Sequence, residues 1–268
     1  MKPYTASMLR ALLCAAFAAN AAHADPATAS PSISSIGPVS SYLTIETGAL
    51  PLVLSVPHGG DDLIPGIPVR TGGTTVRDDH VNELAEAIQR QLAAKTGQRA
   101  YLVGARVSRK YVDFNRDPAK AYEDPALQAV YDAYYATLRQ DVAAVRGKPG
   151  ALLIDIHGQS AVKDAILRGT KDSLTADNAP LYAGPDALFT RILAAGVKVV
   201  PEQAGEREHP GFNGGAIVRA FGRNTPDGID SVQFEFGANW RASPEQIERT
   251  AAVVAEALVA HLRAAGYR

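Results

Sequence analysis

Two histidines stand at the ends of two similar apolar runs, and their placement is the first indication of chemistry in the sequence. His58 follows the run Leu52–Pro57, His157 follows Leu152–Ile156, and each histidine is followed by a glycine. Runs of this length without regular polar alternation predict strands buried on both faces, and α/β sheets hold their ligands at the carboxyl ends of such strands. If the two strands are neighbours, the imidazoles converge and supply two of the three protein ligands of a catalytic zinc site.

The third ligand of such an ion would be a carboxylate, and three aspartates are candidates. Asp61 lies three residues after His58, on the same loop. Asp78 and Asp79 lie at the start of the helix expected after the first histidine strand, which would pack back against the same edge of the sheet. Each aspartate also has an ordinary interpretation as a helix cap or a solvated loop charge.

Two further carboxylates lie within the apolar strands. Asp155 precedes His157 by two residues and therefore faces the same side of its strand, where it can accept the imidazole N–H; a buried structural aspartate is the alternative. Glu235 lies in the apolar segment Val232–Phe236, where an unpaired carboxylate is costly to bury. Beside a metal ion this glutamate can act as general base and then as general acid. The alternative is a salt bridge to one of the arginines.

A dense polar segment contains two arginines with an asparagine between them. A guanidinium group binds a carboxylate through two parallel hydrogen bonds, so Arg116 with Asn115 can hold a substrate carboxylate while Arg109 polarises a carbonyl group. An ion-pair cluster of the arginines with Asp113 and Asp117 is the alternative. The segment therefore indicates either a carboxylate-binding site or a set of internal ion pairs.

Alternating strands and helices must position these side chains. Strands are expected at 42–45, 52–56, 99–107, 152–157, 197–200, 217–220 and 231–236, helices at 78–96, 125–146, 186–195 and from 244 onward, and loops from about 158 to 185. Apolar residues at i, i+3, i+4 and i+7 support the helices, and Ser243 with Pro244 forms an N-cap and first turn. The pattern predicts an α/β fold, a single domain with a mixed, mostly parallel β-sheet and helices on both faces.

The first 24 residues have the features of an export signal. Lys2 and Arg10 provide a positive start, an apolar stretch follows, and Ala22-His23-Ala24 fits a cleavage site. The apolar stretch is too short for a permanent membrane anchor. A lipoprotein signal around Cys14, the one cysteine of the chain, is the alternative, but the residue before that cysteine is not small. The sequence thus predicts a periplasmic or secreted protein.

The overall composition is that of an ordinary globular protein. The chain has 268 residues, of which 46% are hydrophobic, and a net charge of -1. With neither a basic stripe nor an acidic tail, a nucleic-acid partner is not indicated. We expect a signal peptide at residues 1–24, a flexible lead-in at 25–40 and one domain at 41–268. Nothing in the sequence indicates an oligomeric state.

Six separated motifs occur in one order along the chain. They are Pro57–Gly60, Asp78–Leu84, Ser108–Pro118, Asp155–Gly158, Phe212–Ile217 and Gln233–Glu235. Together they resemble the N-formylglutamate amidohydrolase family, which is similar in fold to zinc carboxypeptidases. The chain departs from the family at Gly59 and Gly158, where the family usually has serine. The resemblance spans nearly all of the chain after the signal.

The resemblance implies a zinc site with one ion per chain. His58 and His157 would be ligands together with Asp78, which is favoured over Asp61 because the comparable carboxylate of zinc carboxypeptidases opens the helix after the first histidine strand. It also implies further roles in the site, with Glu235 as the catalytic carboxylate, Arg116 as the anchor of a substrate carboxylate, and His80, Gly214 and Gly215 as lining of the pocket.

The sequence therefore predicts a metal-dependent amidohydrolase. It would cleave a C–N amide bond in an N-acyl amino acid similar to N-formylglutamate, or in a small peptide that carries a free carboxylate. Glu235 would transfer the proton, Arg109 would stabilise the oxyanion, and Arg116 with Asn115 would orient the carboxylate. The alternatives are an exported carboxypeptidase or cell-wall peptidase on the same scaffold, and a carboxylate-binding module without catalysis.

Overall fold

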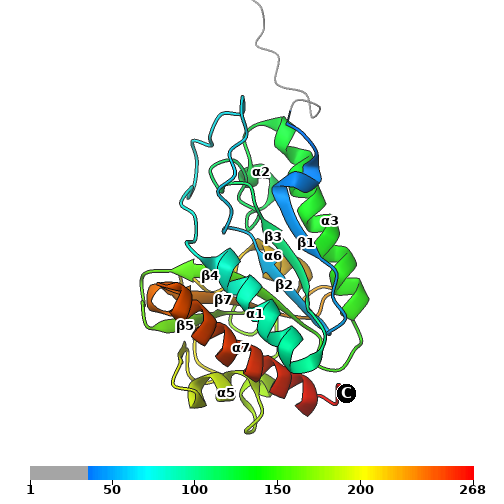
Figure 1. Ribbon diagram of the computed structural model, residues 1–268, viewed down its shortest axis with the longest axis vertical. Coiled ribbons are helices and arrows are strands. Elements are labelled where there is room, and N and C mark those ends of the chain that lie inside the picture. Colours follow the sequence, from blue (N-terminus) through cyan, green and yellow to red (C-terminus); the bar gives the residue numbers. More distant parts are fainter. Residues whose placement is uncertain (1–35) are drawn as a thin grey trace, which may run out of the picture.

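A computed structural model describes residues 36–268 of the chain (Figure 1). The predicted signal peptide and most of the predicted lead-in lie outside these residues. At the described end of the lead-in, Ile36 is buried and its carbonyl accepts a hydrogen bond from the Tyr42 hydroxyl. The lead-in therefore contacts the domain from Ile36 onward. None of the helices between residues 36 and 268 has the length and hydropathy that a bilayer span requires.

Seven strands of the described chain form one sheet, in the order β1-β3-β2-β4-β7-β5-β6. Their bounds are β1 Leu43–Glu46, β2 Leu52–Val56, β3 Tyr101–Ala105, β4 Leu152–Gln159, β5 Ala165–Gly169, β6 Lys198–Val200 and β7 Asp230–Gly237. The pairs β1–β3 and β5–β7 are antiparallel and the other four are parallel. The predicted mixed, mostly parallel sheet is confirmed.

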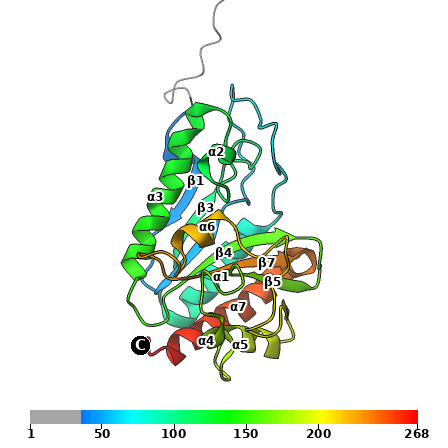
Figure 2. The ribbon, with the colours of Figure 1, turned by 180° about the vertical axis from the view of Figure 1, so that it is seen from behind.

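Helices cover both faces of this sheet, as predicted. They are α1 Val81–Thr96, α2 Pro118–Ala121, α3 Gln128–Val145, α4 Asn178–Tyr182, α5 Leu188–Ala194, α6 Ala216–Phe221 and α7 Pro244–Ala264, with 3₁₀ turns η2 Val39–Tyr42, η3 Pro125–Leu127 and η4 Ala238–Arg241. Helices α1, α5 and α7 lie on one face (Figure 1), and α3 and α6 lie on the other (Figure 2). Their apolar sides form one core with the sheet on each face.

The strands that carry the candidate residues are adjacent. Because β2, β4 and β7 are neighbours and parallel, their carboxyl ends meet at one edge of the sheet. In the register of β4 and β7, His157 lies opposite Glu235, and His58 follows the end of β2. Every residue of β2 is buried, as expected for a parallel strand covered on both sides. The sheet thus brings two histidines and a glutamate to one edge.

Residues 217–220, predicted as a strand, instead lie in helix α6. The start of this helix is held by Asn115, whose Oδ1 accepts the backbone N–H of Ile217 at 3.0 Å. Ile217 and Phe221 of α6 point into the same core as α3. Tertiary contacts therefore override the β-propensity of the Ile217-Val218 pair.

The stretch 158–185, predicted as loop, contains strand β5 and helix α4. The loop prediction was wrong because the charged residue Arg168 interrupts the apolar pattern of β5 in the sequence. Its side chain is nevertheless fully buried, and Arg168 Nε donates to Glu208 Oε1 at 2.9 Å.

Helix α1 begins at Val81 rather than at the predicted residue 78, because His80 has a φ of 62° and cannot belong to a right-handed helix.

Asp141 on α3 is a buried carboxyl group whose Oδ2 has no hydrogen-bond partner among residues 36–268. The residue is 7% exposed, and burial raises the pKa of its carboxyl group to about 7. The native state therefore keeps a proton that the unfolded chain, with an aspartate pKa of about 3.9, releases. By linkage, the contribution of Asp141 to the free energy of unfolding falls as pH rises from about 4 to about 7 and changes no further above that range.

We expect Asp141→Asn to stabilise the protein at pH 8 by about 2–4 kcal/mol and to change its stability little at pH 4, because the amide cannot ionise. Urea unfolding of both proteins at the two pH values measures this difference. An equal effect at pH 4 and pH 8 would show that the native carboxyl group is ionised.

Candidate metal centre and active site

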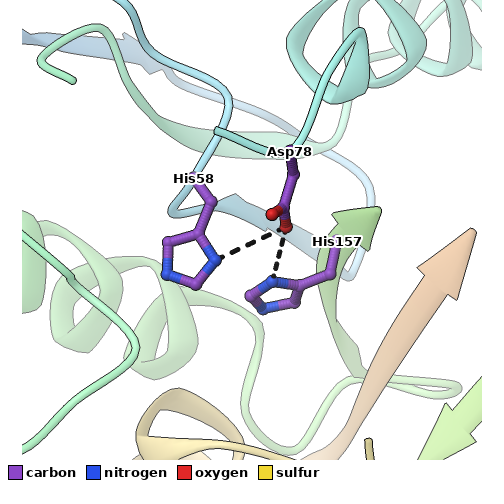
Figure 3. Close-up of side chains that lie close together, drawn as sticks. All are labelled: His58, Asp78 and His157. Carbon is purple, nitrogen blue, oxygen red and sulfur yellow. Dashed lines mark hydrogen bonds and ion pairs between the residues drawn. The ribbon is translucent and has the colours of Figure 1, made fainter. Parts of the chain in front are cut away.

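His58, Asp78 and His157 meet at the carboxyl edge of the sheet (Figure 3). The Nδ1 atom of His58 lies 3.4 Å from Asp78 Oδ2, and Nδ1 of His157 lies 3.2 Å from the same oxygen. All three residues are buried, and their ligand-type atoms lie within 4.8 Å of one another. The two imidazoles, which are 99 residues apart in the chain, therefore converge as the sequence predicted.

Of the three candidate aspartates, only Asp78 contacts the histidines. The side chains of Asp61 and Asp79 are 76% and 66% exposed, and both form ion pairs with Arg77, at 2.8 Å and 3.3 Å. Asp78 is placed by its own backbone, because its N–H donates to the His58 carbonyl at 3.1 Å. The backbone N–H of Gly158 also donates to Asp78 Oδ2 at 3.1 Å. The carboxylate is thus tied to both histidine segments.

Each imidazole uses its second nitrogen to bind another carboxylate. His157 Nε2 donates to Asp155 Oδ2 at 2.9 Å, the pairing that the i−2 position of Asp155 predicted. His58 Nε2 donates to Asp113 Oδ1 at 2.6 Å. Such pairs set the orientation and tautomer of a metal-binding histidine. Both rings therefore direct Nδ1 toward Asp78.

The partner role of Asp113 was missed from the sequence because no spacing rule links it to His58, 55 residues away. A second missed contact had a visible signal. Ser55 is a polar residue in an otherwise apolar buried strand, so it requires a partner. Its hydroxyl donates to Asp155 Oδ1 at 2.8 Å and lies 2.9 Å from the Tyr134 hydroxyl. This chain of hydrogen bonds holds Asp155 against His157.

The geometry of the cluster fits a divalent ion. In a tetrahedral zinc site with bonds of about 2.0–2.1 Å, neighbouring ligand atoms are about 3.3 Å apart, close to the two separations measured here. His58 Nδ1 is buried and has no hydrogen-bond partner among the described residues, so a lone pair is left without a donor. Two histidines and one aspartate are a ligand set that zinc commonly takes.

The charges around the cluster favour a cation. Burial would raise the pKa of Asp78, but its contacts with His157 and His58 hold that pKa well below its usual range. Burial would lower the pKa of His157, yet Asp155 and Asp78 raise it well above the usual value. Without a metal ion, His157 therefore carries a proton among buried carboxylates, and a bound cation could supply that positive charge instead.

Glu235 stands beside this cluster on β7. It is buried, and burial raises its pKa to about 8, with Asp78 and Asp155 adding to the shift and His157 opposing it. Within the described chain its one side-chain hydrogen bond comes from Gln233 Nε2, 2.9 Å from Oε1. The salt-bridge alternative does not hold, because this partner is a neutral amide. A bound cation next to Glu235 would favour its carboxylate form.

Arg109 forms ion pairs inside the protein and also lines the cleft beside the metal cluster. Its Nε and Nη2 atoms donate to Asp113 Oδ2 at 3.1 Å and 3.0 Å, and Nη1 lies 3.5 Å from Asp78 Oδ1. The ion-pair interpretation of this segment is therefore correct for Arg109, although Asp117 pairs with Arg219 instead. Arg109 therefore orients Asp113, the partner of His58, and its predicted oxyanion role stays a prediction.

Arg116 differs from Arg109 because its side chain is 44% exposed. Nη1 donates to the carbonyl of Asn115 at 2.8 Å, and Nε lies 3.9 Å from Asp113 Oδ2. The guanidinium group lines a cleft of about 630 Å³ that contains the metal cluster and Glu235. Its position is consistent with the predicted anchor of a substrate carboxylate.

Asn115, predicted to bind substrate with Arg116, uses its amide inside the protein. Its Nδ2 lies 3.0 Å from His157 Nε2 and 3.3 Å from Gln233 Oε1, while Oδ1 accepts from Ile217 at the start of α6. The amide therefore holds Gln233 and the start of α6, and because Asn115 also lines the cleft, its predicted contact with a substrate stays a prediction.

Of the three residues predicted to line the pocket, Gly214 and Gly215 do so and His80 does not. Gly214 and Gly215 line the cleft as predicted, and a Cβ at Gly215 would lie 2.2 Å from the Asn115 amide. His80 is exposed and does not line the cleft, so its predicted place in the pocket is wrong. Its left-handed backbone directs Nδ1 to the Arg241 carbonyl at 3.0 Å.

The fold and site together define an α/β protein with a two-histidine, one-aspartate cluster at the carboxyl edge of a mixed sheet. No protein-family profile matches the sequence, and no curated protein matches it either. Among solved structures, the chain shares its fold with N-formylglutamate amidohydrolase from Ralstonia eutropha JMP134, at a TM-score of 0.57 and 19% identity, over 84% of this chain and 97% of that one. A gene product of Agrobacterium tumefaciens gives a TM-score of 0.57 and 19% identity, over 85% and 99% of the two chains.

Proposed function

We propose that the protein is an exported, zinc-dependent hydrolase of a C–N amide bond in an N-acyl amino acid or small peptide with a free carboxylate. The observation that carries the proposal is the buried His58, Asp78 and His157 cluster beside Glu235. The shared fold with an N-formylglutamate amidohydrolase supports an amide as the bond that is cleaved.

The site divides the chemistry between the ion and the protein. When bound, zinc supplies Lewis-acid polarisation of the carbonyl and acidifies a water molecule. Glu235 accepts a proton from the attacking water at its carboxylate and passes it to the leaving nitrogen. A desolvated glutamate whose pKa lies near neutrality is suited to both transfers. Asp113 and Asp155 hold the two imidazoles in place throughout.

The exposed guanidinium of Arg116 would bind the substrate carboxylate. A charge-assisted hydrogen bond contributes about 1.5–3 kcal/mol, so we expect Arg116→Met to raise KM by about 10–100-fold and to change kcat little. The effect should disappear for a substrate whose carboxylate is amidated. Steady-state kinetics on both substrates measures it, with Arg106→Met as control, because Arg106 pairs with Asp62 and does not line the cleft. A KM that does not change would place the carboxylate elsewhere.

Metal analysis combined with a substrate panel tests the proposed function. The purified protein should contain one zinc ion per chain, lose activity on chelation and recover it with zinc. The panel consists of formyl, acetyl and aminoacyl derivatives of glutamate together with cell-wall peptides. A protein without stoichiometric zinc that binds these carboxylates without turnover would be a binding module, and the proposal would fail.

An exported carboxypeptidase or cell-wall peptidase is the second candidate. The cleft, at about 630 Å³, has room for a substrate of peptide size, and turnover confined to wall peptides would favour this activity. The proposal includes a signal peptide at residues 1–24, a lead-in at 25–40 and a hydrolase domain at 41–268. Amino-terminal sequencing of the secreted protein tests the cleavage after Ala24.

A further inference from the structure

Arg241, at the end of η4, is a buried arginine that binds three separate backbone segments. Its side chain donates from Nε to the Phe236 carbonyl at 3.2 Å, from Nη2 to the Gln159 carbonyl at 3.3 Å, and from Nη1 to the Asp79 carbonyl. The residue is only 8% exposed. One planar guanidinium group therefore joins the ends of β7 and β4 to the loop before α1.

Each of the three carbonyls lies next to a residue of the site. Asp79 directly follows Asp78, Phe236 directly follows Glu235, and Gln159 is two residues after His157. The backbone of Arg241 also contacts the loop before α1, because His80 Nδ1 lies 3.0 Å from the Arg241 carbonyl. The Arg241 side chain thus links two metal-ligand segments and the glutamate strand to one another.

Gly158 leaves the space that this side chain occupies. A Cβ at Gly158 would lie 2.6 Å from both Cζ and Nε of Arg241, closer than non-bonded atoms approach. The same glycine donates its N–H to Asp78 Oδ2 at 3.1 Å. A side chain at position 158 would have to displace the guanidinium group or move the backbone that holds Asp78.

We propose that Arg241 is a positioning residue for the metal centre, and that residue 158 is a glycine because the Arg241 guanidinium lies where a Cβ would be. The inference rests on the proposed function, since the residues it positions are the proposed zinc ligands and Glu235. Three of the five N–H donors of the guanidinium point at backbone carbonyls in three directions. Lysine, with a single ammonium group, cannot reproduce this geometry.

Zinc affinity of the purified full-length protein tests the inference independently of turnover. Loss of a group that orients metal ligands typically weakens binding by about 10–100-fold. We expect this loss for Arg241→Gln and for Gly158→Ala, and a smaller loss for Arg241→Lys. The absorption spectrum of the cobalt-loaded variants should change, because the ligands are displaced. Gly104→Ala in β3 is the matched control, because a Cβ there would have its nearest neighbours at 3.7–3.9 Å.

A double-mutant cycle links the two positions. If Gly158→Ala acts by displacing the guanidinium group, it should cause no additional loss of zinc affinity in the Arg241→Gln background. Gly158→Ala keeps the arginine and adds one methyl group, so it gives an answer even if Arg241→Gln does not fold. Additive losses in the cycle would overturn the link between the two residues.

Two other outcomes separate this inference from the proposed function. Wild-type zinc affinity and cobalt spectra in Arg241→Gln and Gly158→Ala would overturn the inference alone, and a raised KM with intact metal binding would assign Arg241 to substrate binding instead. A wild-type protein that binds no zinc would overturn the proposed function, and the positioning role with it.

Discussion

Replacing Asp78 with asparagine is expected to remove stoichiometric zinc and to lower kcat/KM by about 10³-fold or more, because a metal ion contributes several kcal/mol to such reactions. Asparagine preserves the shape of the side chain and an oxygen for the Gly158 N–H, but it lacks the negative charge that binds a divalent ion. Zinc content by elemental analysis and steady-state kinetics on the same preparations measure the effect.

The two other aspartates of the same region provide matched controls for this substitution. Asp61→Asn and Asp79→Asn each remove a carboxylate close in sequence, but both side chains are exposed and pair with Arg77. We expect both variants to keep one zinc ion and nearly full activity, since exposed ion pairs contribute little. Loss of zinc from either control, or its retention in Asp78→Asn, would contradict the ligand set. Unfolding of the metal-free proteins checks that all three variants are folded.

Glu235→Gln is expected to lower kcat by about 10²–10⁴-fold, the range attributed to general acid–base catalysis, while zinc content stays at one per chain. The amide occupies the same volume next to His157 but cannot accept the proton of the attacking water. KM should change only a few-fold, because the substrate carboxylate is assigned to Arg116. Single-turnover kinetics together with metal analysis measures the effect.

The pH profile gives a second readout of Glu235. Burial holds its pKa at about 8 in the metal-free protein, and a neighbouring cation favours the ionised form. The rising limb of kcat/KM should therefore lie below pH 8 in the zinc form and be absent in Glu235→Gln. Glu83→Gln, an exposed glutamate on α1, is the control. A wild-type profile in Glu235→Gln would assign the proton transfers to another group.

The sequence by itself determined the architecture and the two histidines. Buried apolar runs that end in His-Gly, alternating with amphipathic helices, predicted parallel strands and a shared edge, and β2 and β4 are indeed neighbours. Ser243 with Pro244 was recognised as the start of α7, and the Ser243 hydroxyl caps it by accepting from Gln246. Asp155 was recognised from its spacing to His157. These features depend on local periodicity, because the pleat and the helical repeat set which neighbours share a face.

The tertiary structure decided how the other side chains of the site are held. The resemblance favoured Asp78, and its contact with both histidines depends on the path by which the loop 59–77 returns to the His58 carbonyl. The pairing of Asp113 with His58 brings together segments separated by a whole helix and strand, and it places the local Arg109–Asp113 ion pair beside the site. The β-branched pair Ile217-Val218 is helical because Asn115 accepts the backbone N–H of Ile217 and the Ile217 side chain packs into the core around α3.

The contacts of the Arg241 guanidinium group also form only in the folded protein. The group joins three chain segments that only the completed sheet brings within hydrogen-bond distance. Local patterns in a sequence report the period of each element, whereas contacts across the fold depend on how loops close and how elements pack. The strand ends that carry the histidines, and Asp155 beside His157, could therefore be predicted, but the partners of Asp113, Arg109 and Arg241 could be assigned only in three dimensions.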